Sequence, residues 1–147
     1  LEGYLRDLGA TSIVPREALS AQDGAPMQSE KWGGGVDTVG GVILQNLFAQ
    51  TVYGGAIACC GMAGGHEIHT AVWPLILRNV SLLGVSSLRT PKGERIAAWE
   101  ALAKDVDAQK LASLSRLEPL SRIHEMAEEI VGGKVRGRVV IDVRSGG

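Results

Sequence analysis

Cysteine is scarce in this sequence, and its scarcity excludes one class of folds. The chain has 147 residues but only two cysteines, Cys59 and Cys60. They are adjacent and fall inside a predicted buried strand, so they cannot form the disulfide framework that stabilises many small secreted domains. The cysteine pattern therefore predicts a protein of a reducing cytoplasm.

Long apolar runs and concentrated charge are also missing. No uninterrupted apolar run approaches the roughly 20 residues that a membrane helix needs, and the first residues do not have the pattern of a secretory leader. The 15 basic and 16 acidic residues nearly balance, and no segment gathers basic side chains into a patch that would attract nucleic acid. The sequence thus predicts neither a membrane partner nor a nucleic-acid partner.

Glycine, in contrast, is plentiful, and its positions mark the ends of predicted elements. The 20 glycines cluster at strand and helix ends, where they serve as turn residues. At the start of the chain, Tyr4 to Leu8 resembles the last turn of a helix stopped by Gly9. We therefore expect the chain to begin inside a fold.

The most legible segment, residues 32–65, predicts a strand, a helix and a second strand. Val36 to Val39 is a short apolar run closed by Gly40 and Gly41. An apolar stripe with spacings of three and four then predicts a helix, and Tyr53-Gly54-Gly55 is expected to end it. Ala56 to Cys60 is an apolar run without polar alternation, which is typical of a parallel strand covered on both faces. The stripe residues are Ile43, Leu44, Leu47 and Phe48.

A crossover of this kind places both strands side by side in one sheet. Ligands of such sheets bind at the carboxyl ends of the strands. The turns at Gly40-Gly41 and at Gly61 to Gly65 are therefore the expected place of a site.

The remaining chain predicts further elements of the same α/β type. Thr11 to Val14 is expected to form a strand that delivers Arg16 to the ligand edge, and Val80 to Val85 a strand that ends at Ser86 and Ser87. Helices are expected from Pro74, across Ile96 to Val106, and from an N-cap at Ser121 to Val131. Arg138 to Val143 predicts a closing strand, and the tail from Arg144 to Gly147 is expected to be loose.

Four motifs carry a family resemblance that covers the chain from about Tyr4 to Val143. They are VDTVGG, YGGAIACCGMAGG, PLILRNVSLLGVSS and GRVVIDV. Together they resemble the zinc-free quinone-oxidoreductase branch of the medium-chain dehydrogenase/reductases, and within it the NADPH-dependent acrylyl-CoA reductases. The resemblance implies a partial Rossmann-type parallel sheet with flanking helices in residues 1–115. Residues 116–147 would then be a helix and strand that return to a catalytic domain built from residues outside this chain.

The resemblance also implies where NADPH would bind. It places Arg16 near the adenosine phosphate, a role that suits a permanently charged, bidentate guanidinium, and it places Gly61 and Met62 against the cofactor. Ser87 offers a small hydroxyl to a phosphate or an amide. Ile76 and Arg138 match family contacts, although on pattern alone Ile76 reads as core, Met62 as a gap filler, and both arginines as solvated side chains. No G-x-G-x-x-G turn followed by a helix occurs, so half of the expected dinucleotide pocket is missing.

Other candidate sites are rejected. Gly65-His66-Glu67, with His69 nearby, spells a tripeptide of zinc alcohol dehydrogenases, but it follows a strand of the cofactor side, and Cys59 and Cys60 would project to opposite faces. We therefore predict no metal. Cys60 reads as a small core residue rather than a nucleophile, and His124 as a surface histidine.

The leading hypothesis is part of an oxidoreductase that transfers a hydride from NADPH to an α,β-unsaturated acyl-CoA or another small activated alkene. No residue of the chain is a convincing proton donor, so the catalytic residues stay unassigned. The alternatives are an NADPH:quinone reductase, another zinc-free medium-chain reductase, or a nucleotide-binding module without catalysis. By resemblance, the intact protein would be a homodimer, with the strand Val80 to Val85 at the interface.

Overall fold

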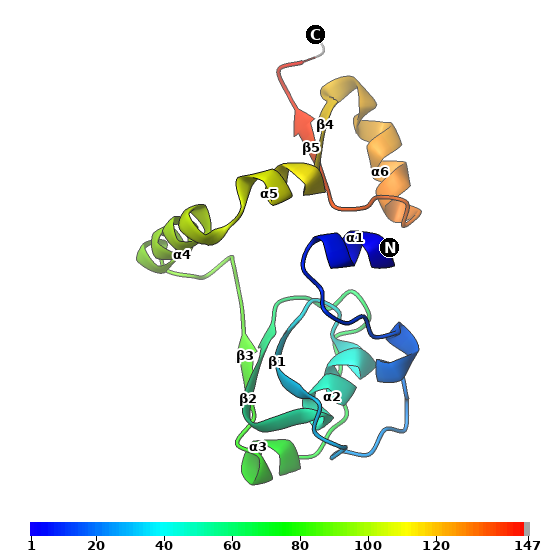
Figure 1. Ribbon diagram of the computed structural model, residues 1–147, viewed down its shortest axis with the longest axis vertical. Helices are drawn as coiled ribbons and strands as arrows, with labels where there is room; N and C mark the ends of the chain where they lie inside the picture. Colours follow the sequence, from blue (N-terminus) through cyan, green and yellow to red (C-terminus); the bar gives the residue numbers. More distant parts are fainter. Residues whose placement is uncertain (146–147) are drawn as a thin grey trace. The chain divides into compact units, whose positions relative to one another are not determined.

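The computed structural model describes residues 1–145, and the chain divides between Thr90 and Pro91 into two compact units. The first unit is built around a three-stranded parallel sheet (Figure 1). Its strands β1 (Trp32–Asp37), β2 (Thr51–Cys59) and β3 (Ser81–Gly84) lie in the order β1-β2-β3, with β2 parallel to both neighbours. The predicted parallel sheet is confirmed.

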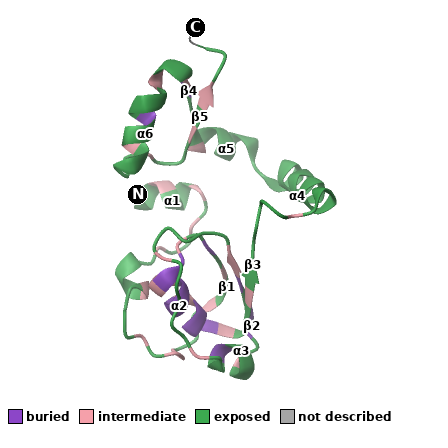
Figure 2. Cartoon of the chain, turned by 180° about the vertical axis from the view of Figure 1, so that it is seen from behind, coloured by how far each residue is buried: buried purple, intermediate pink, exposed green. Residues whose placement is uncertain are grey.

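The helix α2 (Gly41–Ala49) connects β1 to β2 and supplies most of the core. Leu44 and Phe48 of its predicted apolar stripe are buried against Ile57 of β2 and against Val80, while Leu47 packs at the margin of this cluster. Figure 2 shows the burial gathered on α2. Within this unit β2 is covered on one face, since Ile57 is buried and its neighbour Ala56 is exposed. The prediction of cover on both faces is therefore not met by the unit's own residues.

Two predicted strand boundaries are wrong. The first strand ends at Asp37 rather than Val39, because the Asp37 carboxylate accepts hydrogen bonds from Val39 and Gly40 and bends the chain there. The second strand begins at Thr51, so Tyr53-Gly54-Gly55 lies within it instead of ending the helix. Gly54 has φ of 74°, and the pairing register with β1 shifts between Trp32 and Gly34, as expected of a strand irregularity built on glycine.

The expected strand at Thr11 to Val14 does not form. These residues lead from α1 (Glu2–Asp7) into a short 3₁₀ helix, η1 (Arg16–Leu19). β-prone residues become a strand only where a neighbouring strand can pair with them, and no described strand pairs with residues 11–14. The end of α1 is as predicted, with Gly9 in the left-handed region at φ of 111°.

A polar network braces the end of the sheet where β2 begins. The Arg78 guanidinium donates to the carbonyl oxygens of Gln28 at 2.6 Å and Ala49 at 2.9 Å, and it lies 3.3 Å from the Glu30 carboxylate. The buried Asn46 of α2 donates to Leu19 and accepts from Gln28. Backbone groups in the loop before β1 thereby find partners, as buried polar groups must.

The second unit pairs β4 (Ser115–Pro119) with β5 (Arg138–Asp142) in parallel, with η2 (Leu120–Arg122) and α6 (Ile123–Val131) between them. The predicted closing strand is confirmed, whereas β4 was not foreseen. Ser121 lies inside η2, and the residue before α6 is Arg122, so the predicted N-cap is wrong. The Glu118 carboxylate pairs with both Arg116 and Arg122, and so ties β4 to the turn before α6.

Two helices precede this β-α-β unit, α4 (Lys92–Asp105) and α5 (Ala108–Leu114). The predicted helix over Ile96 to Val106 is thus confirmed. Its apolar stripe is exposed (Figure 2), and with Leu111 of α5 it lines an open pocket of about 340 Å³.

After β5 the chain turns at Asp142, which accepts a hydrogen bond from the backbone of Arg144 at 2.9 Å. The predicted loose tail lies outside the described residues at 146 and 147. None of the helices among residues 1–145 is both long and apolar enough to cross a membrane. The division of the chain at residues 115 and 116 stays a prediction of the family resemblance.

Candidate site at the carboxyl edge of the first sheet

The three strands of the first unit end at the same edge of the sheet. Asp37 pairs with Cys59, and Cys59 pairs with Gly84, so the last residues of β1, β2 and β3 are in register. The pairing extends one residue further, because Cys60 donates to the Asp37 carbonyl and Val85 to the Cys59 carbonyl, both at 2.9 Å. The predicted common edge, on which the site was expected, is confirmed.

At this edge two glycine-containing turns pack backbone against backbone. Gly40 has φ of 70°, and a Cβ added to it would lie 2.3 Å from the Gly65 oxygen and 3.2 Å from the Met62 Cα. A Cβ added to Gly61 would lie 2.3 Å from the Thr38 oxygen. Glycine is therefore required here both for its left-handed backbone and for the close approach of the two chains.

Asp37 is the polar residue on which this arrangement is built. Its side chain is 2% exposed. One carboxylate oxygen lies 2.9 Å from the Gly40 nitrogen, and the other lies 3.3 Å from the Val39 nitrogen. Asp37 was not among the predicted site residues, although an acid after an apolar run and shortly before two glycines is the pattern of a side chain that closes a turn on its own backbone.

The two cysteines occupy different environments, and the prediction that Cys60 is a core residue is wrong. Cys60 directly follows the last residue of β2 and is exposed; its sulfur lies 3.3 Å from the Asp37 carbonyl oxygen. Cys59 is half-buried at the margin of the core. Burial raises the pKa of its thiol, and the nearby Asp37 and Cys60 raise it further. A thiol with a raised pKa is a poor nucleophile at neutral pH.

Three of the predicted cofactor residues lie at the carboxyl edge. Gly61 and Met62 begin the turn after β2, and Ser87 lies three residues beyond the end of β3. All three are exposed, and Met62 retains 70% of its accessible surface. A Cβ added to Gly84 would meet nothing within 4 Å, so small side chains leave open space beside the strand ends.

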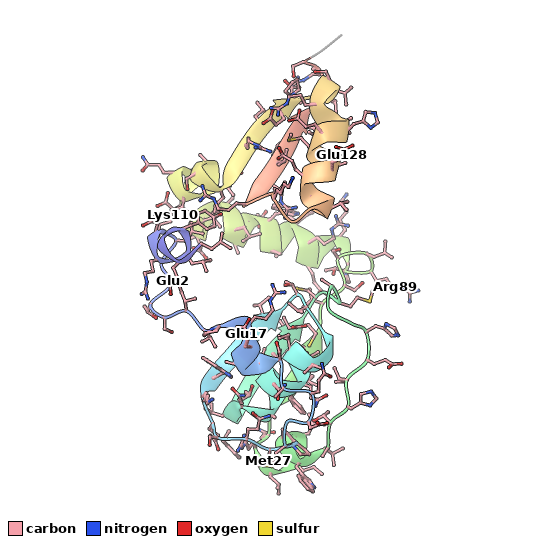
Figure 3. The ribbon with its side chains drawn as sticks, turned by 90° about the vertical axis from the view of Figure 1, so that its right-hand side faces the viewer. Glu2, Glu17, Met27, Arg89, Lys110 and Glu128 are labelled. Carbon is pink, nitrogen blue, oxygen red and sulfur yellow. The ribbon has the colours of Figure 1, made fainter. Side chains whose placement is uncertain are left out.

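The other three predicted residues lie elsewhere. Arg16 opens η1, which packs beside α2 and is marked in Figure 3 by its neighbour Glu17, so Arg16 does not follow a strand as predicted. Ile76 belongs to α3 (Trp73–Leu77), which precedes the start of β3 and thus lies toward the amino edge (Figure 1). Arg138 begins β5 in the second unit.

The histidines of the rejected zinc motif lie on the exposed loop after Gly65. The imidazoles of His66 and His69 lie 3.9 Å and 4.0 Å from the Glu67 carboxylate. Among residues 1–145, no group of three or more His, Cys, Asp and Glu side chains is arranged to hold a metal ion.

Known proteins resemble this chain in sequence over nearly its whole length. It is 41% identical over 142 residues to an acrylyl-CoA reductase of Ruegeria pomeroyi, a match that covers 97% of this chain and 43% of the relative. A putative quinone oxidoreductase of Bacillus subtilis, YhfP, is 34% identical and is covered to 42%. No protein-family model matches. The chain thus spans less than half the length of these relatives.

Solved structures share the fold as well. The structure of Escherichia coli K-12 YhdH with bound NADPH superposes with a TM-score of 0.90 at 38% identity, covering 96% of this chain and 43% of that one. The Bacillus subtilis YhfP structure, solved with NAD bound, superposes with a TM-score of 0.91 at 34% identity, covering 97% of this chain and 44% of that one.

Proposed function

We propose that this chain is part of a medium-chain dehydrogenase/reductase of the quinone-oxidoreductase branch and forms part of the NADPH site of an acrylyl-CoA reductase-like enzyme. The observation that carries the proposal is the match over 96% of the chain to a protein solved with NADPH bound. The shared carboxyl edge of β1, β2 and β3 supports it, since this is where parallel α/β sheets bind nucleotides.

The residues at this edge fit a dinucleotide. A pyridine nucleotide needs close approach to the backbone, and the edge offers the small residues Gly61, Gly84 and Ser87 beside the exposed Met62. We assign Gly61, Met62 and Ser87 to the lining of the cofactor groove. For Arg16, Ile76 and Arg138 the assignment rests on the family resemblance alone, with Arg16 directed to the 2′-phosphate.

The proposed reaction reduces the C=C bond of an α,β-unsaturated acyl thioester. NADPH would supply the hydride for the β-carbon, and a proton would reach the α-carbon. The share of this chain is to bind and orient the cofactor. The buried carboxylate of Asp37 accepts hydrogen bonds from the backbone amides of Val39 and Gly40. We therefore do not assign it as the proton donor, and we assign that role to no other described residue.

The substrate is tested on the intact enzyme. We expect NADPH oxidation with acrylyl-CoA to exceed that with quinones, because the Ruegeria pomeroyi acrylyl-CoA reductase is the more similar relative, at 41% against 34% identity. Turnover with quinones and none with acrylyl-CoA would move the protein to the sister activity. NADH is included as a second donor because YhfP was solved with NAD.

A nucleotide-binding module without catalysis is the second candidate. It is favoured because residues of the first unit alone form the edge at which β1, β2 and β3 end. Titration of the 147-residue chain with NADPH separates the two. Tight binding by this chain alone supports a self-sufficient module, whereas the reductase proposal expects weak or no binding, since the glycine-rich pyrophosphate turn is not in this sequence.

The assembly and compartment of the intact protein are proposed by the same resemblance. We propose a homodimer formed along the β3 edge and a cytoplasmic location. A sedimentation experiment on the intact protein tests the first, and a monomer at micromolar concentration would contradict it.

A further inference from the structure

The buried Asp37 has no role in the hydride transfer proposed above, yet it is held at the centre of the candidate site. It ends β1, and only 2% of it is exposed. Its three side-chain contacts are all with backbone N–H groups, at 2.9 Å and 3.2 Å from Gly40 and 3.3 Å from Val39. A carboxylate removed from water is costly unless hydrogen bonds replace its hydration. The amides of Val39 and Gly40 supply these hydrogen bonds, and the same bonds fix the positions of the two amides.

Asp37 also holds, through its backbone, the second turn, which is residues 61–65 after β2. Its carbonyl oxygen accepts the N–H of Cys60 at 2.9 Å, and the Cys60 sulfur lies 3.3 Å from the same oxygen. Cys60 directly precedes Gly61 and Met62. One residue therefore fixes the first turn with its side chain and the beginning of the second turn with its main chain.

Hydrogen bonds and close packing also fix the turn at residues 38–41 to the turn at residues 61–65. Gly64 donates to the Val39 carbonyl at 2.7 Å, and Gly40 forms a parallel bridge with Gly65. The Gly40 backbone lies so close to Met62 that an added Cβ would be 3.2 Å from the Met62 Cα. A shift of Gly40 must therefore move the turn that carries Met62.

We propose that Asp37 is a positioning residue for the pyridine nucleotide, holding the Gly40 and Met62 turns in the arrangement that the cofactor binds. The inference rests on the proposed function, because it needs NADPH at this edge. A role limited to folding would lower stability without a selective effect on the cofactor. A positioning role raises the Kd and the KM for NADPH more than the KM for the acyl substrate.

The test uses the intact enzyme with Asp37→Ala, Asp37→Asn and a matched control, Thr51→Val. Thr51 is fully buried at the start of β2, and its hydroxyl donates to the Leu47 carbonyl at 2.8 Å. Its loss removes a buried hydrogen bond at the opposite edge of the same sheet. Tm, the Kd for NADPH and both KM values are measured for each variant.

We expect Asp37→Ala to raise the Kd for NADPH about tenfold, and Asp37→Asn about threefold because its amide oxygen still accepts one N–H. Thr51→Val should lower Tm while leaving the Kd within about twofold of the wild type. Amide hydrogen exchange should become faster in residues 61–65 of the Asp37 variants and stay unchanged there in Thr51→Val. If Asp37→Ala does not fold, Asp37→Asn decides the outcome.

Two negative results differ in meaning. If the wild type binds NADPH and the Asp37 variants bind it equally well, or if Thr51→Val weakens binding as much at an equal loss of Tm, the inference is overturned and the proposed function stands. If the intact wild type does not bind NADPH, the proposed function fails and the inference fails with it.

Discussion

At the scale of the residue, the site depends on side chains that are small or fully paired. Gly40, Gly61 and Gly64 allow two turns to touch, and the buried Asp37 carboxylate satisfies the backbone groups of the first turn. Larger side chains would fill the edge or separate the turns. The chemistry assigned to this chain is therefore binding and orientation.

The two cysteines should react at different rates. Cys60 is exposed, while burial raises the pKa of Cys59. Because the thiolate is the reactive form, a raised pKa leaves less of it at neutral pH, and the labelling rate of Cys59 should rise only at higher pH than that of an ordinary thiol. Alkylation followed by peptide mass spectrometry, with Cys60→Ser as the control, measures both rates. Faster labelling of Cys59 at neutral pH would contradict the assigned environments.

Arg16 is the proposed contact of the 2′-phosphate. In the intact enzyme, Arg16→Ala should weaken NADPH about tenfold or more and NADH less than twofold, since a charge-assisted hydrogen bond to phosphate is lost only for NADPH. Arg144→Ala is the control, because the Arg144 side chain is 94% exposed near the end of the second unit. An equal loss of affinity for both cofactors would remove the proposed role.

At the scale of the element, the β1 to α2 turn should be the least tolerant part of the first unit. Gly40→Ala places a Cβ 2.3 Å from the Gly65 oxygen in a residue with φ of 70°, and we expect a loss of about 2 to 4 kcal/mol of stability. Gly3→Ala is the matched control, since Gly3 lies in α1 and its Cβ would meet nothing within 4 Å. That change should be neutral or stabilising by up to about 1 kcal/mol. Chemical denaturation of both variants gives the comparison, and similar values would show that the two turns do not pack as described.

The second unit should lose stability in acid. Its β4 to α6 segment is tied by Arg122, whose hydrogen bonds lower the pKa of Glu125. A carboxyl with a lowered pKa contributes stability that is fully present above its ordinary pKa and is lost as the pH falls through the lowered value. Thermal unfolding from neutral to acidic pH, with Glu125→Gln as the comparison, should show a smaller pH dependence for the variant over that range. Equal slopes would indicate that this ion pair does not contribute.

At the scale of the whole molecule, the sequence predicted the parallel sheet and its common edge because apolar runs and glycine turns depend on local pattern. The predictions that failed concern elements whose formation depends on pairing with segments distant in the sequence. Thr11 to Val14 has strand residues but no described strand beside it, and β4 forms where no strand was predicted because β5 pairs with it. The roles of Asp37 and Arg78 were not predicted, because both side chains bind backbone groups, and a sequence pattern does not show which backbone groups lie near them.

The central claim is that the strand ends of the first sheet hold a pyridine nucleotide, and amide hydrogen exchange of the intact protein with and without NADPH tests it most directly. We expect NADPH to slow amide exchange in residues 38–41, 61–65 and 85–87, and to leave exchange at Thr51, the start of β2, unchanged. Protection confined to other segments, with none at these three turns, would contradict it.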